Sequence, residues 1–387
     1  MLQERASRLQ TESAFEVLAR ARALERSGRD VVHLEIGQPD FPTPRHIRDA
    51  AIDALNAGHT GYSPTPGIPE LREAIAEHAS GLRGIAVGPE RIIVTPGAKP
   101  LLFYAVNALA GAGDEVIYPD PGFPMYRSLI EHAGARPVPI RLREENAFRF
   151  DIDEFRRLVS DRTRLVILNS PENPTGGVLS RSDLEAVAAE ARSRGFYVLS
   201  DEVYLHFAYD EPFTSVASLP GMLDRTIIVD GFSKTWAMTG WRLGWGVVPP
   251  ELFATFELYN VNIVSCACTF GQHGAIAAIR GPWEPVEEMI AEFRRRRDFL
   301  VDALNALPGV SCVRPRGAFY AFPNITGTGL AADELSRRLL DEAGVATLPG
   351  TAFGPAGAGY LRLSYASAFE RLEAAVERMG RFLASSS

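Results

Sequence analysis

Residues 230–246, DGFSKTWAMTGWRLGWG, contain one of only two lysines in this chain, Lys234; the other is Lys99. The 387-residue sequence has 40 Lys and Arg residues, so nearly all of its basic side chains are arginines. Arginine stays protonated at any accessible pH, whereas a lysine whose pKa is lowered can lose its proton and attack a carbonyl. Lys234 is therefore a candidate nucleophile that forms a Schiff base, with an ordinary surface lysine as the simpler alternative.

The residues around Lys234 place it at the end of a strand. Residues 226–230 (TIIVD) form a short β-branched run that predicts a buried strand, and turn-compatible residues follow. This edge of an open α/β sheet is where ligands bind. Arg242 opens another apolar run, residues 241–248 (WRLGWGVV), so a lysine and an arginine would converge here. An aldehyde cofactor that also carries a phosphate would suit this pair.

The segment at residues 231–244, GFSKTWAMTGWRLG, resembles the lysine signature of the class I/II, fold-type I pyridoxal-phosphate-dependent aminotransferases, a family that includes the aspartate aminotransferases. The resemblance runs from about residue 34 to the C-terminus. It implies an α/β fold in which residues 46–282 form a large domain with a mostly parallel, seven-stranded sheet between helices. A smaller α+β domain would combine both chain ends: residues 1–45, with an N-terminal arm, and residues 283–387, with a long connecting helix.

A phosphate site is predicted after the strand at residues 91–95 (RIIVT), where a tight turn precedes a helix that begins near residue 99. Free N–H groups and the helix dipole attract anions at such a helix start, although a plain βα turn has the same pattern. The resemblance implies that the phosphate is held by Gly97, Ala98, Lys99 and Arg242. Ser233 is a further expected cofactor-binding residue.

The cofactor ring would lie between residues from three other segments. Asp201 follows the strand at residues 196–200, and a carboxylate there can keep the pyridine nitrogen protonated, which makes the ring an electron sink. A helix cap is the alternative role for Asp201. The resemblance further implies that Phe123 stacks on the ring and that Asn173 and Tyr204 bind the phenolic oxygen. Glu172 departs from the pattern, because the family often has Asn at this position.

The substrate residues are implied by the resemblance as well. Arg362, in the segment LRLSYA, would bind the α-carboxylate through its planar guanidinium. Gly37, Asn173 and Phe15 would complete the substrate site. Lys99 has two open roles: it neutralises the phosphate, or it binds the distal carboxylate of an acidic substrate as in one subgroup. Aspartate, glutamate, aromatic and other apolar amino acids all stay open as substrates.

These residues predict an enzyme that moves an amino group from an α-amino acid to a 2-oxo acid in a ping-pong reaction through a Lys234 aldimine. Its catalytic residues would be Lys234, Asp201 and Tyr204. The alternatives are a pyridoxal-phosphate-dependent β-lyase, such as a carbon–sulfur lyase, and a non-catalytic cofactor-binding regulator. The resemblance implies a homodimer in which Tyr62 reaches the other subunit's cofactor phosphate; a loop tyrosine packed on a proline is the alternative for Tyr62.

The composition argues against several other classes of protein. A net charge of −8 and a pI near 5.5 are not typical of nucleic-acid binding. No apolar run approaches the ~18 residues of a membrane span, and the N-terminus has no apolar signal segment. The three cysteines lack disulfide or zinc spacing, so we expect a cytoplasmic protein without a metal site. Cys266 and Cys268 are expected in the core, within one helical region at residues 251–280.

Overall fold

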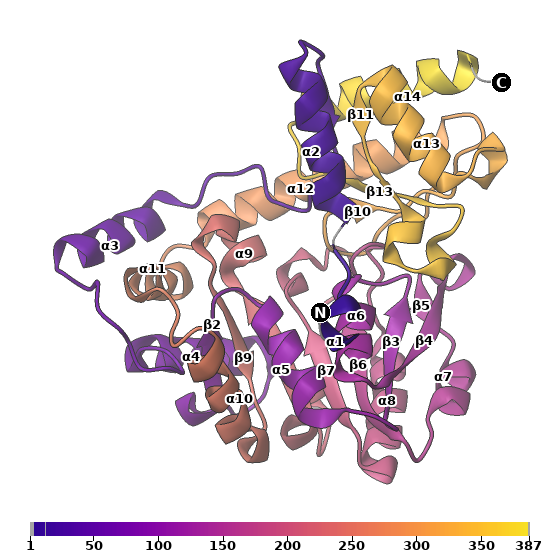
Figure 1. Cartoon of the computed structure of the whole chain (residues 1–387). Helices are drawn as coiled ribbons and strands as arrows, with labels where there is room; N and C mark the ends of the chain where they lie inside the picture. Colours follow the sequence, from indigo (N-terminus) through magenta and orange to yellow (C-terminus); the bar gives the residue numbers. More distant parts are fainter. Residues whose placement is uncertain (1–3, 12, 386–387) are drawn as a thin grey trace.

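One mixed β-sheet of eight strands lies at the centre of the larger lobe (Figure 1) in the computed structural model, which describes residues 4–11 and 13–385. Its strand order is β2-β9-β8-β7-β6-β3-β4-β5. The strands are β2 (Ile92–Thr95), β3 (Glu115–Asp120), β4 (Arg136–Arg143), β5 (Arg149–Phe150), β6 (Thr163–Asn169), β7 (Tyr197–Asp201), β8 (Thr226–Gly231) and β9 (Gly244–Val247).

Parallel pairing of the middle strands aligns their carboxyl ends. The pairs β4–β3, β3–β6, β6–β7 and β7–β8 are parallel, whereas β9 runs antiparallel to β2 and β8. Asn169 at the end of β6 lies opposite Asp201 at the end of β7. The sheet has one strand more than the seven expected, because the chain turns back after β4 and pairs the two-residue β5 antiparallel with it.

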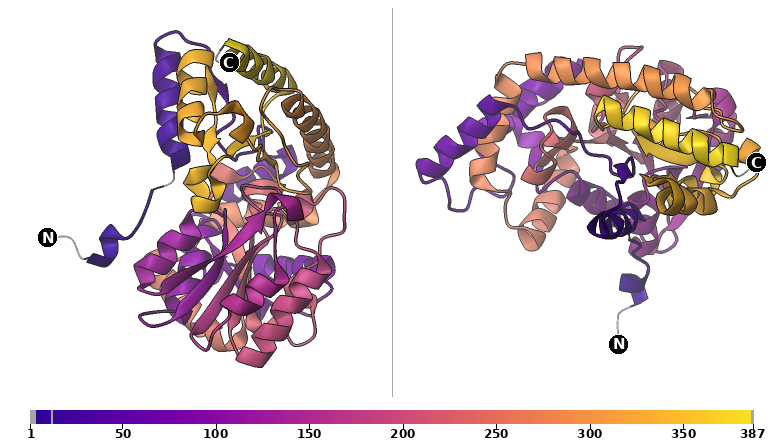
Figure 2. Two further views of the ribbon diagram at one scale, coloured as in Figure 1. Left: turned by 90° about the vertical axis from the view of Figure 1, so that its right-hand side faces the viewer. Right: turned by 90° about the horizontal axis from the view of Figure 1, so that it is seen from above.

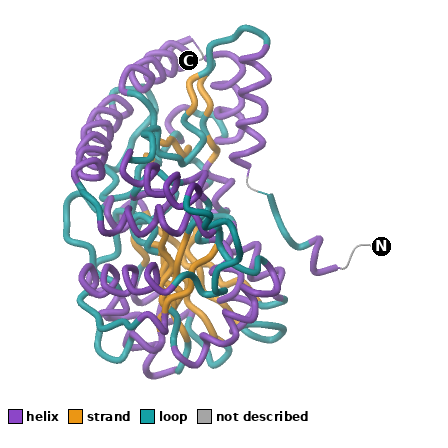
Figure 3. Tube along the Cα trace, turned by 90° about the vertical axis from the view of Figure 1, so that its left-hand side faces the viewer, coloured by secondary structure: helices purple, strands orange, loops and turns teal. Residues whose placement is uncertain are grey.

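Helices cover both faces of this sheet, as the tube in Figure 3 shows. The helices of this lobe are α3 (Arg45–Asn56), α4 (Pro69–Arg83), α5 (Lys99–Leu109), α6 (Met125–Ala133), α7 (Ile152–Leu158), α8 (Arg181–Arg194), α9 (Phe232–Thr235), α10 (Pro250–Ile263) and α11 (Thr269–Arg280). Alternate residues of β6 point to opposite faces: Leu165 and Ile167 pack with α5, α6 and α10, and Val166 and Leu168 pack with α7 and α8. Burial on both sides explains the apolar run at the centre of β6.

The second lobe joins both ends of the chain (Figure 1). Strand β1 (Val32–His33) pairs in parallel with β11 (Val345–Ala346), and β13 (Leu361–Ser364) lies between β10 (Tyr320–Ala321) and β12 (Leu348–Pro349). This pairing supports the predicted division of the chain at residues 45 and 282, which stays a prediction. The helices here are α2 (Ser13–Arg26), α12 (Glu284–Asn305), α13 (Ala332–Arg338) and α14 (Phe369–Ser385), and α1 (Glu4–Ser7) lies on an arm that projects from the body (Figure 2).

The helical region expected at residues 251–280 is interrupted. Residue Ser265 has a left-handed φ of 63° in the turn between α10 and α11. The two cysteines expected in the core lie in this turn, where Cys266 is half-buried and Cys268 is exposed. The expectation was wrong because apolar periodicity does not reveal a turn that requires a left-handed residue. Cys312 is the buried cysteine.

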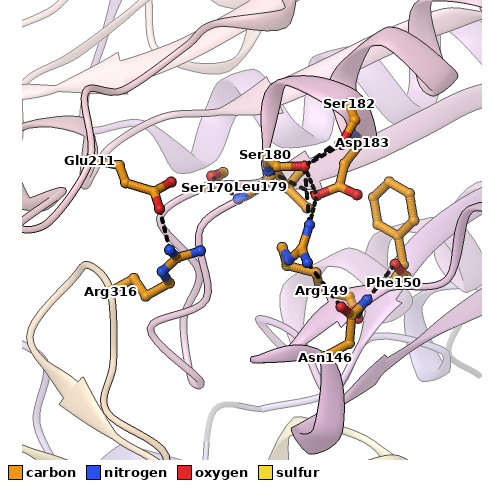
Figure 4. Close-up of polar contacts among 10 residues, drawn as sticks. All are labelled: Asn146, Arg149, Phe150, Ser170, Leu179, Ser180, Ser182, Asp183, Glu211 and Arg316. Atoms are coloured by element: carbon orange, nitrogen blue, oxygen red, sulfur yellow. Dashed lines mark hydrogen bonds and ion pairs between the residues drawn. The ribbon is translucent and has the colours of Figure 1, made fainter.

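The loop from β6 to α8 is fixed by a reciprocal cap at the start of α8 (Figure 4). Ser180 accepts a hydrogen bond from the backbone N–H of Asp183, and the Asp183 carboxylate accepts one from the backbone of Ser180 at 2.8 Å. Arg149 of β5 donates to Asp183 at 3.0 Å, and Leu179 donates its N–H to Ser170 at 3.0 Å. These contacts hold the loop that carries Glu172 and Asn173.

Glu172 in this loop is a buried carboxyl group. Burial raises its pKa from the ordinary value of 4.5 to about 8, against hydrogen bonds from the hydroxyl and the backbone N–H of Thr175, the latter at 3.0 Å. The folded chain therefore keeps a proton that the unfolded chain releases above pH 4.5. Because the folded pKa is raised, this group's contribution to stability falls as the pH rises from about 4.5 to about 8.

The variant Glu172→Gln keeps an acceptor oxygen for Thr175 and removes the ionisable group. We expect the free energy of unfolding of the variant, minus that of wild type, to be about 1–3 kcal/mol larger at pH 8 than at pH 5. Urea denaturation at both pH values measures this difference. Glu288→Gln, at an exposed position of α12, is the matched control and should show no such change. An equal effect of Glu172→Gln at both pH values would contradict the expectation.

Candidate active site

A cavity of about 640 Å³ lies at the carboxyl ends of β6, β7 and β8. Its wall also includes residues of the second lobe, such as Tyr320 of β10 and Arg362 of β13. The cavity collects most of the site residues that the sequence predicts: Phe15, Gly37, Ala98, Lys99, Phe123, Asn173, Asp201, Tyr204, Ser233, Lys234, Arg242 and Arg362. Two predicted residues, Gly97 and Tyr62, do not line it.

Lys234 lies directly after β8, in the short helix α9. Its side chain is half-buried, and its Nζ donates a hydrogen bond to the backbone carbonyl of Gly37 at 2.5 Å. The ring centroids of Tyr204 and Phe319 each lie 5.8 Å from this nitrogen. The amine therefore faces the cavity between a carbonyl of the N-terminal segment and two aromatic rings.

Asp201 is buried at the end of β7. Burial raises its pKa to about 6, and the hydrogen bond from Tyr126 and the charge of Lys234 oppose this rise. The hydroxyl of Tyr126 donates to Oδ2 of Asp201 at 2.8 Å. Tyr126 was missed by the sequence analysis, although it lies only three residues after Phe123 in the same segment. A cationic group in the cavity would favour the charged carboxylate.

Two asparagines connect this aspartate to the loop after β6. Asn169 donates its amide N–H to the carbonyl of Asp201 at 3.0 Å and accepts the backbone N–H of Asn173 at 2.9 Å. The Oδ1 atom of Asn173 is buried and has no hydrogen-bond partner among the described residues. Buried polar atoms are nearly always paired, so this atom indicates a place for a polar ligand group.

The start of α5 forms a cradle with Arg242. Gly97 has a left-handed φ of 80°, and a Cβ on it would collide with the Arg242 guanidinium. A Cβ on Gly244 would likewise collide with the backbone of Gly97 and Ala98. No side chain caps α5 at Ala98, and Ala98 lines the cavity, so the positive end of the helix dipole faces the cavity and favours an anion there. Gly97 thus has no side chain that would displace the Arg242 guanidinium from the cradle.

Arg242 precedes β9 instead of opening it, as its apolar context suggested. The strand begins at Gly244, because Arg242 itself adopts a left-handed φ of 52°. Its guanidinium donates to the carbonyl of Thr239 at 2.9 Å. This backbone conformation turns the side chain toward the start of α5, where it adds a positive charge to the cradle.

The buried side chain of Arg362 enters the cavity from β13. Its guanidinium donates to the carbonyl of Glu35 and lies 4.6 Å from the ring centroid of Tyr320 and 5.3 Å from that of Phe353. The hydroxyl of Tyr320 is 2.7 Å from that of Tyr204. The sequence analysis did not select Tyr320 or Phe353, since only the fold brings their segments to the site.

One part of the cavity wall is apolar and also carries the second lysine. The Nζ of Lys99 lies 5.5 Å from the ring centroid of Phe123. The larger apolar side chains that line the cavity include Phe15, Leu102, Phe123, Leu348 and Phe353. A carboxylate and an aromatic group would thus each find complementary groups here.

Tyr62 lies outside the cavity, with 93% of its surface exposed. Within residues 4–11 and 13–385, no cluster of three or more His, Cys, Asp or Glu residues has the geometry to hold a metal ion. The same residues include no helix that is long and apolar enough to cross a membrane.

The residues of this cavity fit pyridoxal phosphate. Lys234 offers an amine for the aldehyde, Asp201 a carboxylate for the ring nitrogen, and Asn173 an unpartnered buried polar atom. The cradle at Ala98 and Arg242 offers the positive end of the α5 dipole and a guanidinium charge for the phosphate. This donor set matches the chemistry of an aldehyde, a pyridine ring and a phosphate on one molecule.

Comparisons with known proteins agree with this fit. Residues 29–379 match the family model for class I and II aminotransferases. The chain is 46% identical over 362 residues to an aspartate aminotransferase of Pyrococcus abyssi, covering 92% of each chain. It is 44% identical over 360 residues to aromatic-amino-acid aminotransferase 2 of Thermococcus litoralis, covering 91% of this chain and 92% of the relative.

A solved structure of an aspartate aminotransferase from Thermus thermophilus with maleate superposes with a TM-score of 0.95 at 38% identity, covering 98% of this chain and 99% of that one. An aromatic aminotransferase from Pyrococcus horikoshii gives a TM-score of 0.90 at 44% identity, with 94% and 99% coverage. The predicted family, fold and cofactor are thereby confirmed. The chain belongs to the class I and II aminotransferases, the pyridoxal-phosphate-dependent enzymes of fold type I that transfer an amino group between an amino acid and a 2-oxo acid.

Proposed function

We propose that this aminotransferase acts on acidic amino acids and their 2-oxo acids, that it also admits aromatic side chains, and that Lys234 is its base. The observation that carries this proposal is one cavity that combines Lys234, Asp201 and Arg362 with Lys99 and an apolar wall. The named relatives include aspartate and aromatic-amino-acid aminotransferases. The relatives do not support a β-lyase or a non-catalytic regulator.

The roles of the residues follow from their positions. Bound pyridoxal phosphate supplies an aldehyde that takes up amino groups and a ring that withdraws electrons from the substrate's Cα. Lys234, once its amine is free, takes the proton from the substrate's Cα through Nζ. Asp201 holds a proton on the ring nitrogen through its buried carboxylate. Asn173 and Tyr204 bind the phenolic oxygen.

The substrate is oriented by residues of the second lobe and of the N-terminal segment. Arg362 binds the α-carboxylate, because its planar guanidinium offers parallel donors and is already held by the carbonyl of Glu35. Gly37, which is proposed to lie near the substrate carboxylate, brings its backbone carbonyl to Lys234. Phe15 covers the entrance, with 60% of its surface exposed in the single chain.

The first test concerns Lys234. We expect purified protein to be yellow, and borohydride to bleach this colour while fixing the cofactor on Lys234. Peptide mapping by mass spectrometry locates the label. Lys234→Ala should bind the cofactor without a reducible bond, because no other amine replaces it. A label on Lys99, or a wild-type colour in Lys234→Ala, would refute the assignment.

Lys99 is proposed to bind the distal carboxylate of an acidic substrate. This chain uses arginine almost everywhere else, and a phosphate contact alone would be served by arginine. A compact ammonium leaves space for a substrate side chain that a guanidinium would fill. The position of Lys99 next to Phe123 places this charge on the cavity wall, 5.5 Å from a ring that is proposed to stack on the cofactor.

The variant Lys99→Met keeps most of the side-chain volume and removes the charge. We expect KM for aspartate, glutamate and 2-oxoglutarate to rise roughly 10–100-fold, the effect of losing one charge-assisted contact. KM for phenylalanine should stay within about threefold of wild type. Steady-state kinetics with both donors, together with cofactor affinity, measure the difference. Equal losses for both donors with weaker cofactor binding would instead assign Lys99 to the phosphate.

A homodimer is proposed because the single chain leaves apolar side chains uncovered beside Tyr62. Asn260 of α10 donates to the carbonyl of Thr65 at 2.9 Å, so this helix packs against the Tyr62 loop. Exposed apolar residues on the same helix are Leu258, Val261 and Ile263.

We further propose a cytoplasmic location, in line with three free cysteines. The proposed domains are residues 46–282, and residues 1–45 together with residues 283–387.

Mixed dimers test whether Tyr62 acts across the interface. We expect Tyr62→Phe to weaken cofactor binding roughly 10-fold or more, since it deletes one hydrogen bond to a charged group. If Tyr62 of each chain reaches the other chain's site, a dimer of one Tyr62→Phe chain and one Lys234→Ala chain has one site in which both residues are wild type. That site should release its cofactor as slowly as the wild-type protein does, which absorbance measures. Its absence in confirmed mixed dimers would place Tyr62 in its own subunit's site or in none.

A further inference from the structure

Tyr320 contacts three of the proposed site residues, although none of the roles above uses it. It lies in β10, where it pairs with Ser364 of β13, and only 1% of its surface is exposed. Its hydroxyl lies 2.7 Å from that of Tyr204, and its ring lies under Arg362. It also lines the cavity. Tyr320 thus joins residues from the two lobes at one point.

Gly37 shows how closely Tyr320 is fitted to the site. A Cβ on Gly37 would overlap the Tyr320 hydroxyl. The carbonyl of the same glycine accepts the hydrogen bond from Lys234. The absence of a side chain at residue 37 therefore lets Tyr320 reach Tyr204 and lets the backbone approach Lys234. Any larger residue at this position would push the Tyr320 hydroxyl away from its partner.

The environment of the two hydroxyl groups favours one direction for their hydrogen bond. The positively charged guanidinium of Arg362 lies 4.6 Å from the Tyr320 ring centroid. A cation on the ring face withdraws electron density and makes the phenolic O–H a stronger donor. A hydroxyl has one proton and two acceptor positions. If Tyr204 accepts the proton of Tyr320, its own proton is left for a group in the cavity.

We propose that Tyr320 is a positioning residue, which donates its hydroxyl proton to Tyr204 and so directs the Tyr204 proton toward the phenolic oxygen of the cofactor. This inference rests on the proposed role of Tyr204. The arrangement also links substrate and cofactor sites, because Arg362, which is proposed to bind the substrate carboxylate, lies on the ring that orients Tyr204. Tyr320 acts through Tyr204 and need not touch the reacting atoms.

The variant Tyr320→Phe removes the hydroxyl and keeps the ring under Arg362. A hydrogen bond to the phenolic oxygen stabilises its anionic form, so its loss raises the pKa at which the visible band of the bound cofactor titrates. We expect a rise of roughly 0.3–1 unit and about two- to tenfold weaker cofactor binding, with KM for the 2-oxo acid unchanged. Absorbance titration of the loaded protein without substrate, and titration of cofactor-free protein, measure these values.

A double-mutant cycle separates positioning from a general structural effect. Tyr204→Phe alone should raise the same pKa at least as much, and adding Tyr320→Phe to it should change nothing further. Tyr365→Phe is the matched control: this buried tyrosine donates to the carbonyl of Ala318 at 3.0 Å, outside the cavity, and that carbonyl also accepts from Tyr209. The control should leave the visible band unchanged.

Each outcome of the cycle decides between the claims. A full additional shift from Tyr320→Phe in the Tyr204→Phe background would overturn the inference, and so would an unchanged band in Tyr320→Phe. A lowered pKa in Tyr320→Phe would show that Tyr204 donates to Tyr320, the opposite direction. If Tyr204→Phe itself leaves the band unchanged, the proposed role of Tyr204 is wrong and the inference falls with it.

Discussion

The site depends on a buried ion pair network that fixes the ends of two neighbouring strands. Arg83, at the last turn of α4, donates to Glu202 at 2.6 Å and to Asp230 at 2.8 Å, and all three side chains are buried. Glu202 directly follows Asp201, and Asp230 lies four residues before Lys234. Burial raises the pKa of Asp230 to about 7, with the Arg83 charge opposing the rise. Because an unpaired buried charge is strongly unfavourable, the network holds β7 and β8 in one arrangement and sets the spacing between the proposed base and the proposed ring-nitrogen partner.

Around this fixed edge, the cavity is completed by segments with unfavourable local conformations. Arg242 and Ala318 have left-handed φ angles of 52° and 56°, which a residue with a Cβ rarely adopts. The carbonyl of Ala318, two positions before Tyr320, accepts a hydrogen bond from Tyr209 at 2.6 Å and a longer one from Tyr365 at 3.0 Å, so the strained residue keeps a donor when one of the two is lost. Such strain is tolerated where the surrounding structure fixes the backbone, and here it directs side chains into the cavity. The sheet therefore fixes the positions of the strand ends, and the strained connections direct further side chains toward them.

The sequence could predict those parts of the site that are local in the chain. A β-branched run followed by turn-compatible residues places Lys234 just past a strand, and the apolar run at residues 196–200 (FYVLS) places Asp201 at a strand end. Parallel pairing then brings strand ends together. Contacts such as Tyr126 with Asp201, Tyr320 with Tyr204 and Arg83 with Glu202 join residues 75, 116 and 119 positions apart. No local pattern encodes these pairs, because they depend on how helices and lobes pack. The same limit explains the extra strand β5 and the exposed Cys268, which depend on turns with left-handed residues.

The distribution of lysine connects the composition to the chemistry of the cavity. Both lysines of the chain line it, whereas arginine forms the buried ion pairs, as Arg83 does with Glu202 and Asp230. Arginine suits these pairs because its charge is permanent and its fork binds two carboxylates. The proposed role of Lys234 as nucleophile and base needs an amine that can lose its proton, which excludes arginine. In the proposed role of Lys99, a compact ammonium beside Phe123 leaves room for a substrate side chain. On a flexible four-carbon stem, such an ammonium would pair with an acidic substrate and turn aside for an aromatic one, so the proposed range of substrates needs only one charge in a single cavity.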